Sequence, residues 1–292
     1  MAKASGGGSR GQAVLVQLLV MAGLAILLYP AAANWFSARN HNNEIAGYTQ
    51  GVADLPEAER QRELRLAEDY NARMPQGPLR DPYSSAPATE TEESAAYASY
   101  ERLLGVSDSG VIGSLSYPEV GITLPVYHGT SDEVISKGAG HLYGSSLPVG
   151  GPSTHSVLTA HSGLASAKLF TDLHRSETGQ LFSVEVLGEK HYYRVDSIVT
   201  VRPEDTRSLR IVAGEDYVTL ITCTPIGVNS HRLLVRGVRV PPPESGREQL
   251  RGDEVSAGFP WWALALVGGS AASGVVLFRP RRRGRTDVVP AA

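Results

Sequence analysis

The sequence predicts a mostly β protein: a closed or nearly closed, antiparallel-rich barrel of about eight strands, preceded by a helical segment and flanked by two apolar helices. Short β-prone segments alternate with Gly and Pro from about residue 100 to residue 240. Residues 37–74 are polar and helix-prone, and two uncharged apolar stretches bracket the chain. With 292 residues, the chain is long enough for one sizeable domain or two small ones.

The predicted strands are short, rich in β-branched and aromatic residues, and bounded by turn formers. They lie at 110–115, 122–127, 156–159, 181–187, 191–195, 198–201, 217–222 and 232–240. One short helix is expected around Ala167 to Leu173. Pro241 to Pro243 end the last strand, because proline cannot donate to a strand ladder. The predicted barrel domain is therefore 100–240, followed by a linker at 241–258.

Residues 37–99 are expected to hold two helices and a loop. Asp54 and Pro56 supply a cap and then a proline in the first turn, so one helix should end here and a second should run from about Pro56 to Arg73. The second helix carries a stripe that is expected to pack on the barrel rather than bind a ligand. Its members are Leu66, Tyr70 and Met74.

A loop is predicted at 75–87, where turn-forming residues are frequent. Three acidic residues follow it: Glu90, Glu92 and Glu93. We expect them to form solvated surface. A cation site is less favoured, because the sequence offers no partner ligands beside them.

The two apolar stretches predict membrane segments. Residues 259–278 have about the length that a bilayer-crossing helix needs, and Trp261 and Trp262 fit an interfacial aromatic belt. Residues 13–36 form either a transmembrane anchor or a cleavable signal, because a basic start, an apolar run and the alanines at 31–33 also describe a signal peptide. The length of the apolar run favours a retained anchor.

Basic residues at both ends predict the orientation. Lys3 and Arg10 lie in residues 1–12, and five arginines lie in residues 279–292. By the positive-inside rule, both ends are expected in the cytoplasm and residues 37–258 outside the cell. The predicted location is the cell membrane, with an extracellular catalytic domain. A nucleic-acid patch explains the arginine run less well, because the run directly follows an apolar helix.

Charge and cysteine content exclude further classes. The formal net charge is −3, and seven of the 27 Lys and Arg residues lie in the two ends, so the middle of the chain is acidic. An acidic surface argues against nucleic acid as a partner. Cys223 is the only cysteine, so the chain cannot form an internal disulfide and depends on its core.

Cys223 ends a β-prone run that begins at Tyr217, and Arg232 opens the next strand. A hairpin would bring the two residues level, because paired strands lie about 5 Å apart. Together with His161, they supply a thiol nucleophile, a cation for an oxyanion and a proton-transfer partner, which is the set that acyl transfer through a thioester needs. For Cys223 alone, the more frequent explanation is a small buried hydrophobe.

The other histidines are weaker candidates. His231 competes with His161, but it adjoins Arg232, and neighbouring residues on a strand face opposite ways. His161 is therefore preferred. We expect packing or loop roles for His128, His141 and His155.

The segments around these residues resemble the sortases, and more narrowly the pilus-assembling class C sortases of Gram-positive bacteria. The resemblance rests on Thr219-Leu-Ile-Thr-Cys223, Asn229-Ser-His-Arg232-Leu-Leu-Val-Arg-Gly237 and Leu158-Thr-Ala-His161. Further matching segments are 124–130, 138–142, 146–151 and 167–173. The resemblance runs from about Trp35 to the C-terminal anchor.

The resemblance implies an eight-stranded sortase barrel and a cysteine transpeptidase that uses no metal or other cofactor. Cys223 would attack the Thr–Gly bond of an LPxTG-like sorting signal, His161 would transfer protons, and Arg232 would stabilise the oxyanion. A lysine amine of the next pilin subunit would resolve the thioester into an isopeptide bond. The implied partners are pilin subunits and the membrane, with cell-wall precursor as an alternative acceptor.

Asp81, Pro82 and Tyr83 match a segment that acts as a lid in class C enzymes. From residue types alone, Asp-Pro-Tyr is more often an ordinary turn. The resemblance implies that Asp81 lies near Arg232 and that the ring of Tyr83 covers Cys223. Such a lid would offset the arginine charge and exclude water and competing nucleophiles.

Thr222 and Ile226 are expected to line the substrate groove, although Ile226 stands where the family is expected to carry an aromatic residue. Three other functions stay open. One is a housekeeping sortase that attaches proteins to cell-wall precursor, which the lid segment and C-terminal anchor argue against. Another is an inactive membrane-bound binding module in which Cys223 is buried. The third is a thiol hydrolase that releases peptides to water.

Overall fold

The computed structural model describes residues 8–73, 79–83, 95–107, 109–243 and 257–279. The chain divides into two compact units, one within 34–258 and the other combining 1–33 with 259–292. Several sequence predictions lie outside the described residues: Met74, the acidic residues Glu90, Glu92 and Glu93, most of the linker, and the arginine-rich tail beyond residue 279.

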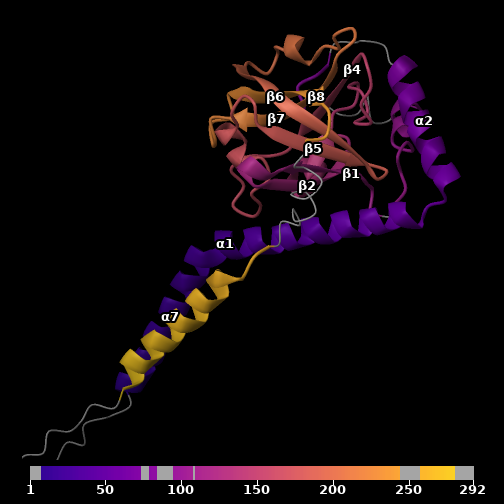
Figure 1. The fold of residues 1–292 in the computed structure, drawn as a ribbon. Coiled ribbons are helices and arrows are strands. Elements are labelled where there is room, and N and C mark those ends of the chain that lie inside the picture. The colour runs from indigo at the N-terminus through magenta and orange to yellow at the C-terminus, as the bar shows by residue number, and fades with distance from the viewer. Residues whose placement is uncertain (1–7, 74–78, 84–94, 108, 244–256, 280–292) are drawn as a thin grey trace, which may run out of the picture. The chain divides into compact units, whose positions relative to one another are not determined.

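The larger unit is built on a closed eight-stranded β-barrel (Figure 1), which confirms the predicted fold class. The strands are β1 (Val111–Tyr117), β2 (Ile122–His128), β3 (Ala139–His141), β4 (Thr154–Thr159), β5 (Leu181–Val186), β6 (Glu189–Val201), β7 (Asp216–Thr224) and β8 (His231–Val240). Around the barrel they follow the order β1-β2-β3-β4-β7-β8-β6-β5. The pairs β2–β3 and β4–β7 are parallel, and the other pairs are antiparallel.

Two strand predictions were wrong in detail. Residues 191–195 and 198–201 were expected as two strands but belong to the single strand β6, whose pairing with β8 shifts between Val195 and Ser197. A bulge of this kind resets the alternation of side chains without ending the strand. The sequence also missed β3, because three buried residues are too few to show a period.

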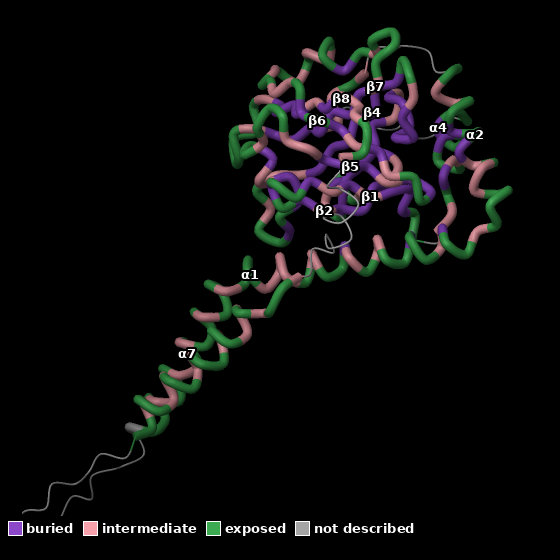
Figure 2. The backbone as a smooth tube through the Cα atoms, in the orientation of Figure 1, coloured by how far each residue is buried: buried purple, intermediate pink, exposed green. Residues whose placement is uncertain are grey.

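The main core fills the barrel, and the buried parts of the chain gather in its strands (Figure 2). Phe182 of β5 and Tyr193 of β6 stack with their ring centroids 5.6 Å apart. Gly237 of β8 permits this stack, because a Cβ there would come within 2.5 Å of the Phe182 ring. All six residues of β4 are buried, as are seven of the nine in β7. These two strands therefore form a rigid support for the loops that leave their ends.

The helices are α1 (Gly8–Asp54), α2 (Glu57–Arg73), α4 (Ala95–Tyr100), α5 (Asp132–Lys137) and α7 (Trp261–Phe278), with 3₁₀ turns at Pro118–Val120, Thr171–Arg175 and Arg207–Leu209. α1 joins the first apolar stretch and the polar segment after it in one helix, and it ends at the predicted break. The helix expected at 167–173 is instead the 3₁₀ turn at Thr171–Arg175.

The stripe predicted on α2 packs only in part. Tyr70 packs against the core as expected, with its ring centroid 6.1 Å from that of Tyr100. Leu66 is 38% exposed, however, and Leu64 and Ala67 are buried instead. Asn71 fixes the rotation of the helix, since its side chain accepts a hydrogen bond from the Leu147 N–H at 2.7 Å and donates to the Leu147 carbonyl at 3.1 Å. Small Ala67 permits the close approach that this two-way backbone contact requires.

In the smaller unit, the N-terminal part of α1 pairs with α7. Both helices are long and apolar enough to cross a membrane. The Gln17 amide donates to the Ser270 carbonyl at 3.0 Å, and the Ser273 hydroxyl donates to Gln17 Oε1 at 2.9 Å. A Cβ at Gly269 would lie 3.0 Å from Leu24 Cδ1, so glycine permits close contact there. Small residues and side-chain hydrogen bonds are the means by which helices associate in lipid.

Candidate active site

Cys223 and Arg232 face each other across the β7–β8 hairpin. They are direct partners in the antiparallel register, near the end of β7 and the start of β8. Each residue is only 7% exposed. The predicted cross-strand pairing therefore exists, and it places a guanidinium beside the thiol.

His161 lies in the loop that leaves β4 alongside β7. The two strands run parallel, with Thr159 opposite Ile221. The chain continues along β7, because the Ser162 hydroxyl donates to the Cys223 carbonyl at 2.8 Å. His161, between these two contacts, thus lies at the level of Cys223. The three side chains proposed for the chemistry come from one end of the β4–β7–β8 sheet segment.

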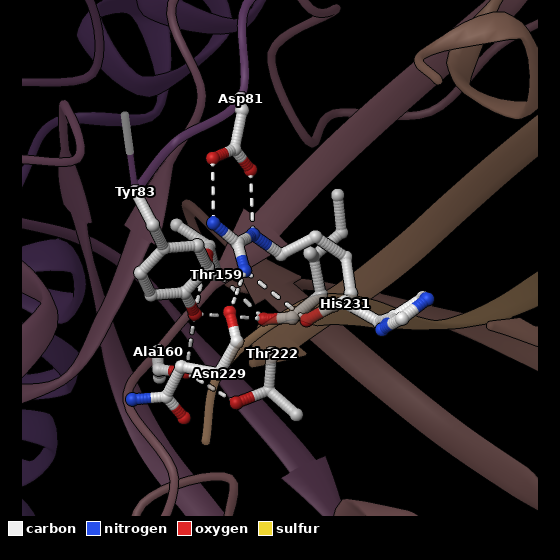
Figure 3. A network of polar contacts seen from close by, with 9 residues as sticks. Asp81, Tyr83, Thr159, Ala160, Thr222, Asn229 and His231 are labelled. Carbon is white, nitrogen blue, oxygen red and sulfur yellow. Dashed lines mark hydrogen bonds and ion pairs between the residues drawn. The ribbon is translucent and has the colours of Figure 1, made fainter. Parts of the chain in front are cut away.

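Asp81 forms a two-point ion pair with Arg232. Nε of the guanidinium donates to Asp81 Oδ1 and Nη2 donates to Oδ2, both at 2.7 Å (Figure 3). Nη1 donates to the carbonyls of Asn229 at 2.9 Å and His231 at 3.1 Å. The side chains of Arg232 and Asp81 are 9% and 8% exposed. Every nitrogen of the Arg232 guanidinium thus donates to a group of its own chain.

Tyr83 is fixed against the ends of β4 and β7. Its hydroxyl donates to the Ala160 carbonyl at 2.6 Å, lies 3.2 Å from the Ile221 carbonyl, and accepts from the Thr159 hydroxyl at 2.7 Å (Figure 3). Its ring centroid lies 5.8 Å from that of His161. Burial raises the pKa of the Tyr83 hydroxyl, so it remains a neutral donor.

The ring of Tyr83 also lies against the cation, with the guanidinium carbon of Arg232 5.0 Å from its centroid. Pro82, between Asp81 and Tyr83, is half-buried. The segment 81–83 therefore contacts the arginine through Asp81 and both the arginine and the histidine through Tyr83.

Electrostatics favour a protonated thiol in this arrangement. Burial raises the pKa of Cys223, the Arg232 guanidinium opposes that rise, and the Asp81 carboxylate adds to it. A thiol is a poor nucleophile compared with its thiolate. The site is therefore closed, with its sulfur buried and held in the less reactive form.

The two predicted groove residues differ in exposure. Thr222 is buried, and its hydroxyl donates to the Ala160 carbonyl at 2.9 Å. Ile226 is 49% exposed and lies over Gly163, where an added Cβ would collide with it. The competing histidine, His231, contacts the hydroxyl of its neighbour Ser230 at 2.9 Å. Among the described residues, no cluster of His, Cys, Asp or Glu side chains is suited to a metal ion.

Sequence reasoning missed Asp132, whose Oδ1 lies 2.9 Å from Nε2 of His161. It also missed Ser162 and Thr159, which hydrogen-bond to the Cys223 carbonyl and to Tyr83. The signal for Asp132 is weak, because an acidic residue in the first turn of a helix is common for reasons of helix stability.

A family model described as the sortase domain matches residues 115–240. Sortase C-1 from Actinomyces oris is 46% identical, with a TM-score of 0.59 over 62% of this chain and 99% of the solved chain. Sortase C from Streptococcus pneumoniae, whose structure was described in relation to pilin substrate specificity, is 41% identical, with a TM-score of 0.60 over 68% of this chain and 97% of the solved chain. Sortase A from Streptococcus agalactiae is 25% identical over 72% of this chain and 77% of its own length.

Proposed function

Because the chain belongs to the sortase family of cysteine transpeptidases, and its solved relatives include class C enzymes, we propose that it joins pilin subunits. In this proposal its substrates are pilins that carry an LPxTG-like sorting signal, and its product is an isopeptide bond to a lysine of the next subunit.

The chemistry assigned to the site proceeds in two steps. The Cys223 sulfur attacks the carbonyl carbon of the Thr–Gly bond, and the Arg232 guanidinium stabilises the oxyanion that forms. His161 gives a proton to the leaving glycine amine as the thioester forms. A lysine amine then attacks the thioester, loses its proton through His161, and releases the sulfur.

The observation that carries this proposal is the pairing of Cys223 with Arg232 across the hairpin, with Asp81 bound to the same guanidinium. A carboxylate fits the arginine because it resembles the oxygen anion that the reaction generates. We infer that residues 81–83 form a lid that substrate must displace. A lid of this kind suits an enzyme whose acceptor is a protein lysine, because water and small amines are kept from the sulfur until the subunits have docked.

The two apolar helices support a membrane location. We propose that both cross the membrane, with residues 37–258 outside the cell and both ends in the cytoplasm. This topology places the barrel where a pilin emerging from the membrane presents its sorting signal. Ile226, exposed beside the His161 loop, is proposed to line the groove for that signal, with buried Thr222 supporting the wall behind it.

The test is transfer by the full-length chain in detergent micelles, using an LPxTG-type peptide and a lysine-bearing pilin domain. Mass spectrometry should find the peptide joined to the pilin with loss of the residues after threonine. Cys223→Ala should abolish this product, and Arg232→Ala should nearly do so.

Other products would contradict the proposal in distinguishable ways. Joining only to a cell-wall precursor amine would indicate a housekeeping enzyme. Release of the cleaved peptide to water, undiminished by the pilin, would indicate a hydrolase. A Cys223 that resists thiol reagents even after Tyr83 is replaced would indicate a binding module.

A further inference from the structure

Asp132, the first residue of α5, contacts the imidazole of His161. Its Oδ1 lies 2.9 Å from Nε2 of the ring. An ionised carboxylate only accepts hydrogen bonds, so Nε2 carries the proton and donates it to this contact. The other nitrogen, Nδ1, is then the one with a lone pair for proton exchange.

The same helix also holds the backbone of His161. The His161 N–H donates to the Ile135 carbonyl at 3.3 Å, and the His161 carbonyl accepts from Phe170 N–H at 3.0 Å. Backbone and ring are therefore fixed together, and α5 supplies two of the three contacts. The His161 side chain is 21% exposed, which leaves it room to meet a substrate amine.

Helix stability alone offers a competing explanation for Asp132. Acidic residues in a first turn interact favourably with the positive end of a helix. However, α5 is already capped by Ser131, whose hydroxyl accepts from Val134 N–H at 3.4 Å. A second acid, Glu133, occupies the same turn and pairs with Lys137 at 3.7 Å. Glu133 supplies the helix effect in the same turn through an ion pair of its own, which makes it a matched control.

We infer that Asp132 is a positioning residue for the proton transfer that the proposed function assigns to His161. It fixes the tautomer with hydrogen on Nε2 and holds the orientation of the ring. This inference rests on the proposed role of His161 and extends it to a residue outside the motifs that carry the family resemblance.

The proton path follows from this tautomer. Nδ1 takes the proton of the Cys223 thiol as the sulfur becomes a nucleophile. It passes that proton to the leaving amine as the C–N bond of the sorting signal breaks and the thioester forms. In the second step Nδ1 takes a proton from the lysine amine, and returns it to the sulfur as the C–S bond breaks. Asp132 remains a carboxylate throughout.

The test measures transfer from a fluorescent LPxTG-type peptide to a lysine-bearing pilin domain by the full-length chain in micelles. Asp132→Ala should lower kcat about 2- to 5-fold with little change in KM, since the lost hydrogen bond comes from a side chain that is 90% exposed and screened by solvent. Asp132→Asn keeps an acceptor without the charge and should fall between Asp132→Ala and the unchanged chain. Asp132→Glu should restore most of the rate.

The split between kcat and KM, together with rescue by Asp132→Glu, separates positioning from mere stability. Glu133→Gln should keep both constants. If Asp132→Ala is poorly folded, Asp132→Asn carries the decision, because it preserves shape and hydrogen bonding.

An unchanged kcat in the Asp132 variants would overturn the inference. An equal loss in Glu133→Gln would also overturn it, because the effect would then belong to helix α5. His161→Ala distinguishes this failure from that of the proposed function. Full activity in His161→Ala removes the role of His161 itself, whereas an inactive His161→Ala beside unaffected Asp132 variants removes only the positioning role.

Discussion

The N–H groups of Arg232 that bind Asp81 are also the groups that would bind the substrate oxyanion in the proposed reaction. Its Nε and Nη2 bind Asp81, and its Nη1 binds the carbonyls of Asn229 and His231. The Nη1 contacts hold the guanidinium on its own hairpin, independently of Asp81. Opening the proposed lid would therefore free the two donors that bind Asp81 without releasing the arginine, which suits the proposed oxyanion role.

The charge of Asp81 should govern the acidity of Cys223. In Asp81→Asn the anion that raises the Cys223 pKa is removed, while the Arg232 guanidinium that lowers it remains. The pH dependence of Cys223 alkylation should therefore shift to lower pH. Iodoacetamide labelling that is quenched at fixed times, followed by mass spectrometry, measures this shift.

The matched control for this variant is Asp196→Asn. Asp196 forms a similar two-point pair with Arg236, at 3.1 and 2.7 Å, on the β6–β8 pair. Its loss should leave the alkylation profile in place. Identical profiles for Asp81→Asn and the unchanged chain would contradict a link between the lid and the thiol.

Tyr83 should control access to the sulfur. Tyr83→Ala loses the hydroxyl contacts with Ala160 and Thr159, and one hydrogen bond of this kind contributes about 1 kcal/mol. Cys223 alkylation should accelerate by roughly fivefold or more, since open forms become more populated. Tyr192→Ala, a half-buried tyrosine of β6, should react at the unchanged rate. Equal labelling rates for both variants would contradict the proposal that Tyr83 limits access to Cys223.

The contacts of the candidate site could be predicted from the sequence where the contacting residues are close together in the chain. Cys223 and Arg232 are joined by a short loop, so their cross-strand pairing follows from the strand pattern alone. The Asp81–Arg232 pair joins residues 151 positions apart. The spacing of residues along the sequence does not predict such a long-range contact, and only the family resemblance implied it. Asp132 was missed because its residue type and position are equally expected for helix stability.

At the scale of elements, the strands explain how distant residues reach one end of the sheet. β4 and β7 run parallel, so the loops after both strands leave at the same end. That end carries His161 after β4 and Cys223 at the finish of β7. The antiparallel strand β8 begins there and brings Arg232.

Strand prediction failed where the period of two is interrupted. β6 contains a bulge and was divided in two, and β3 is too short to show alternation. For α2, the predicted stripe was correct at Tyr70 and wrong at Leu66. The helix is rotated so that Ala67 and Asn71 face the barrel domain, because Asn71 makes two hydrogen bonds with the Leu147 backbone.

The pairing of α1 with α7 predicts a specific cross-link. In a Cys223→Ala background, Leu24→Cys with Gly269→Cys should cross-link with a mild oxidant or a short bismaleimide, because a Cβ at 269 lies 3.0 Å from Leu24 Cδ1. Leu24→Cys with Gly268→Cys should not, since nothing lies within 4 Å of a Cβ at 268. After proteolysis between the two helices, the cross-linked fragments should migrate together on a gel, whereas fragments that are not cross-linked should separate.

The same cross-link also decides whether the first apolar stretch is retained. A cross-linked species that contains residue 24 requires that the stretch has not been cleaved away. Absence of residue 24 from the mature chain would instead establish a signal peptide. Equal cross-linking of both cysteine pairs would contradict a helix contact through Gly269.

On the scale of the whole molecule, buried histidines should make the barrel sensitive to acid. Burial lowers the pKa of His128, His155 and His191 to about 4 and that of His141 to about 3. The ordinary value is about 6.5, so the unfolded chain takes up protons first as the pH falls. Stability that is complete above pH 6.5 is therefore lost between about 6.5 and 4, at up to about 1.4 kcal/mol per pH unit for each histidine.

Thermal unfolding at pH 7.5, 6.5, 5.5 and 4.5 measures this loss. His191→Phe should flatten the dependence by one titrating group, because neither ring nitrogen of His191 finds a hydrogen-bond partner among the described residues. The exposed His174 provides the control, and His174→Gln should leave the slope unchanged. A midpoint that stays constant down to pH 4.5 would contradict the expected loss of stability in acid.

The architecture of the whole chain was the most predictable level. Apolar stretches, turn residues and a repeated short-strand pattern are properties of many residues at once, so single errors do not alter the outcome. The barrel closure confirms that reasoning. The strand pattern does not predict the order of the strands around the barrel. β7 lies between β4 and β8, and its pairing with β4 joins segments that are far apart in sequence.

The burial of Cys223 has a consequence for how long the protein stays usable. In the proposed extracellular location, no glutathione pool restores an oxidised sulfur. Peroxides convert exposed thiolates to sulfenic acid and then, irreversibly, to higher oxides. A cysteine that is 7% exposed and kept protonated reacts slowly with such oxidants, so the proposed nucleophile would stay intact while the enzyme waits for substrate.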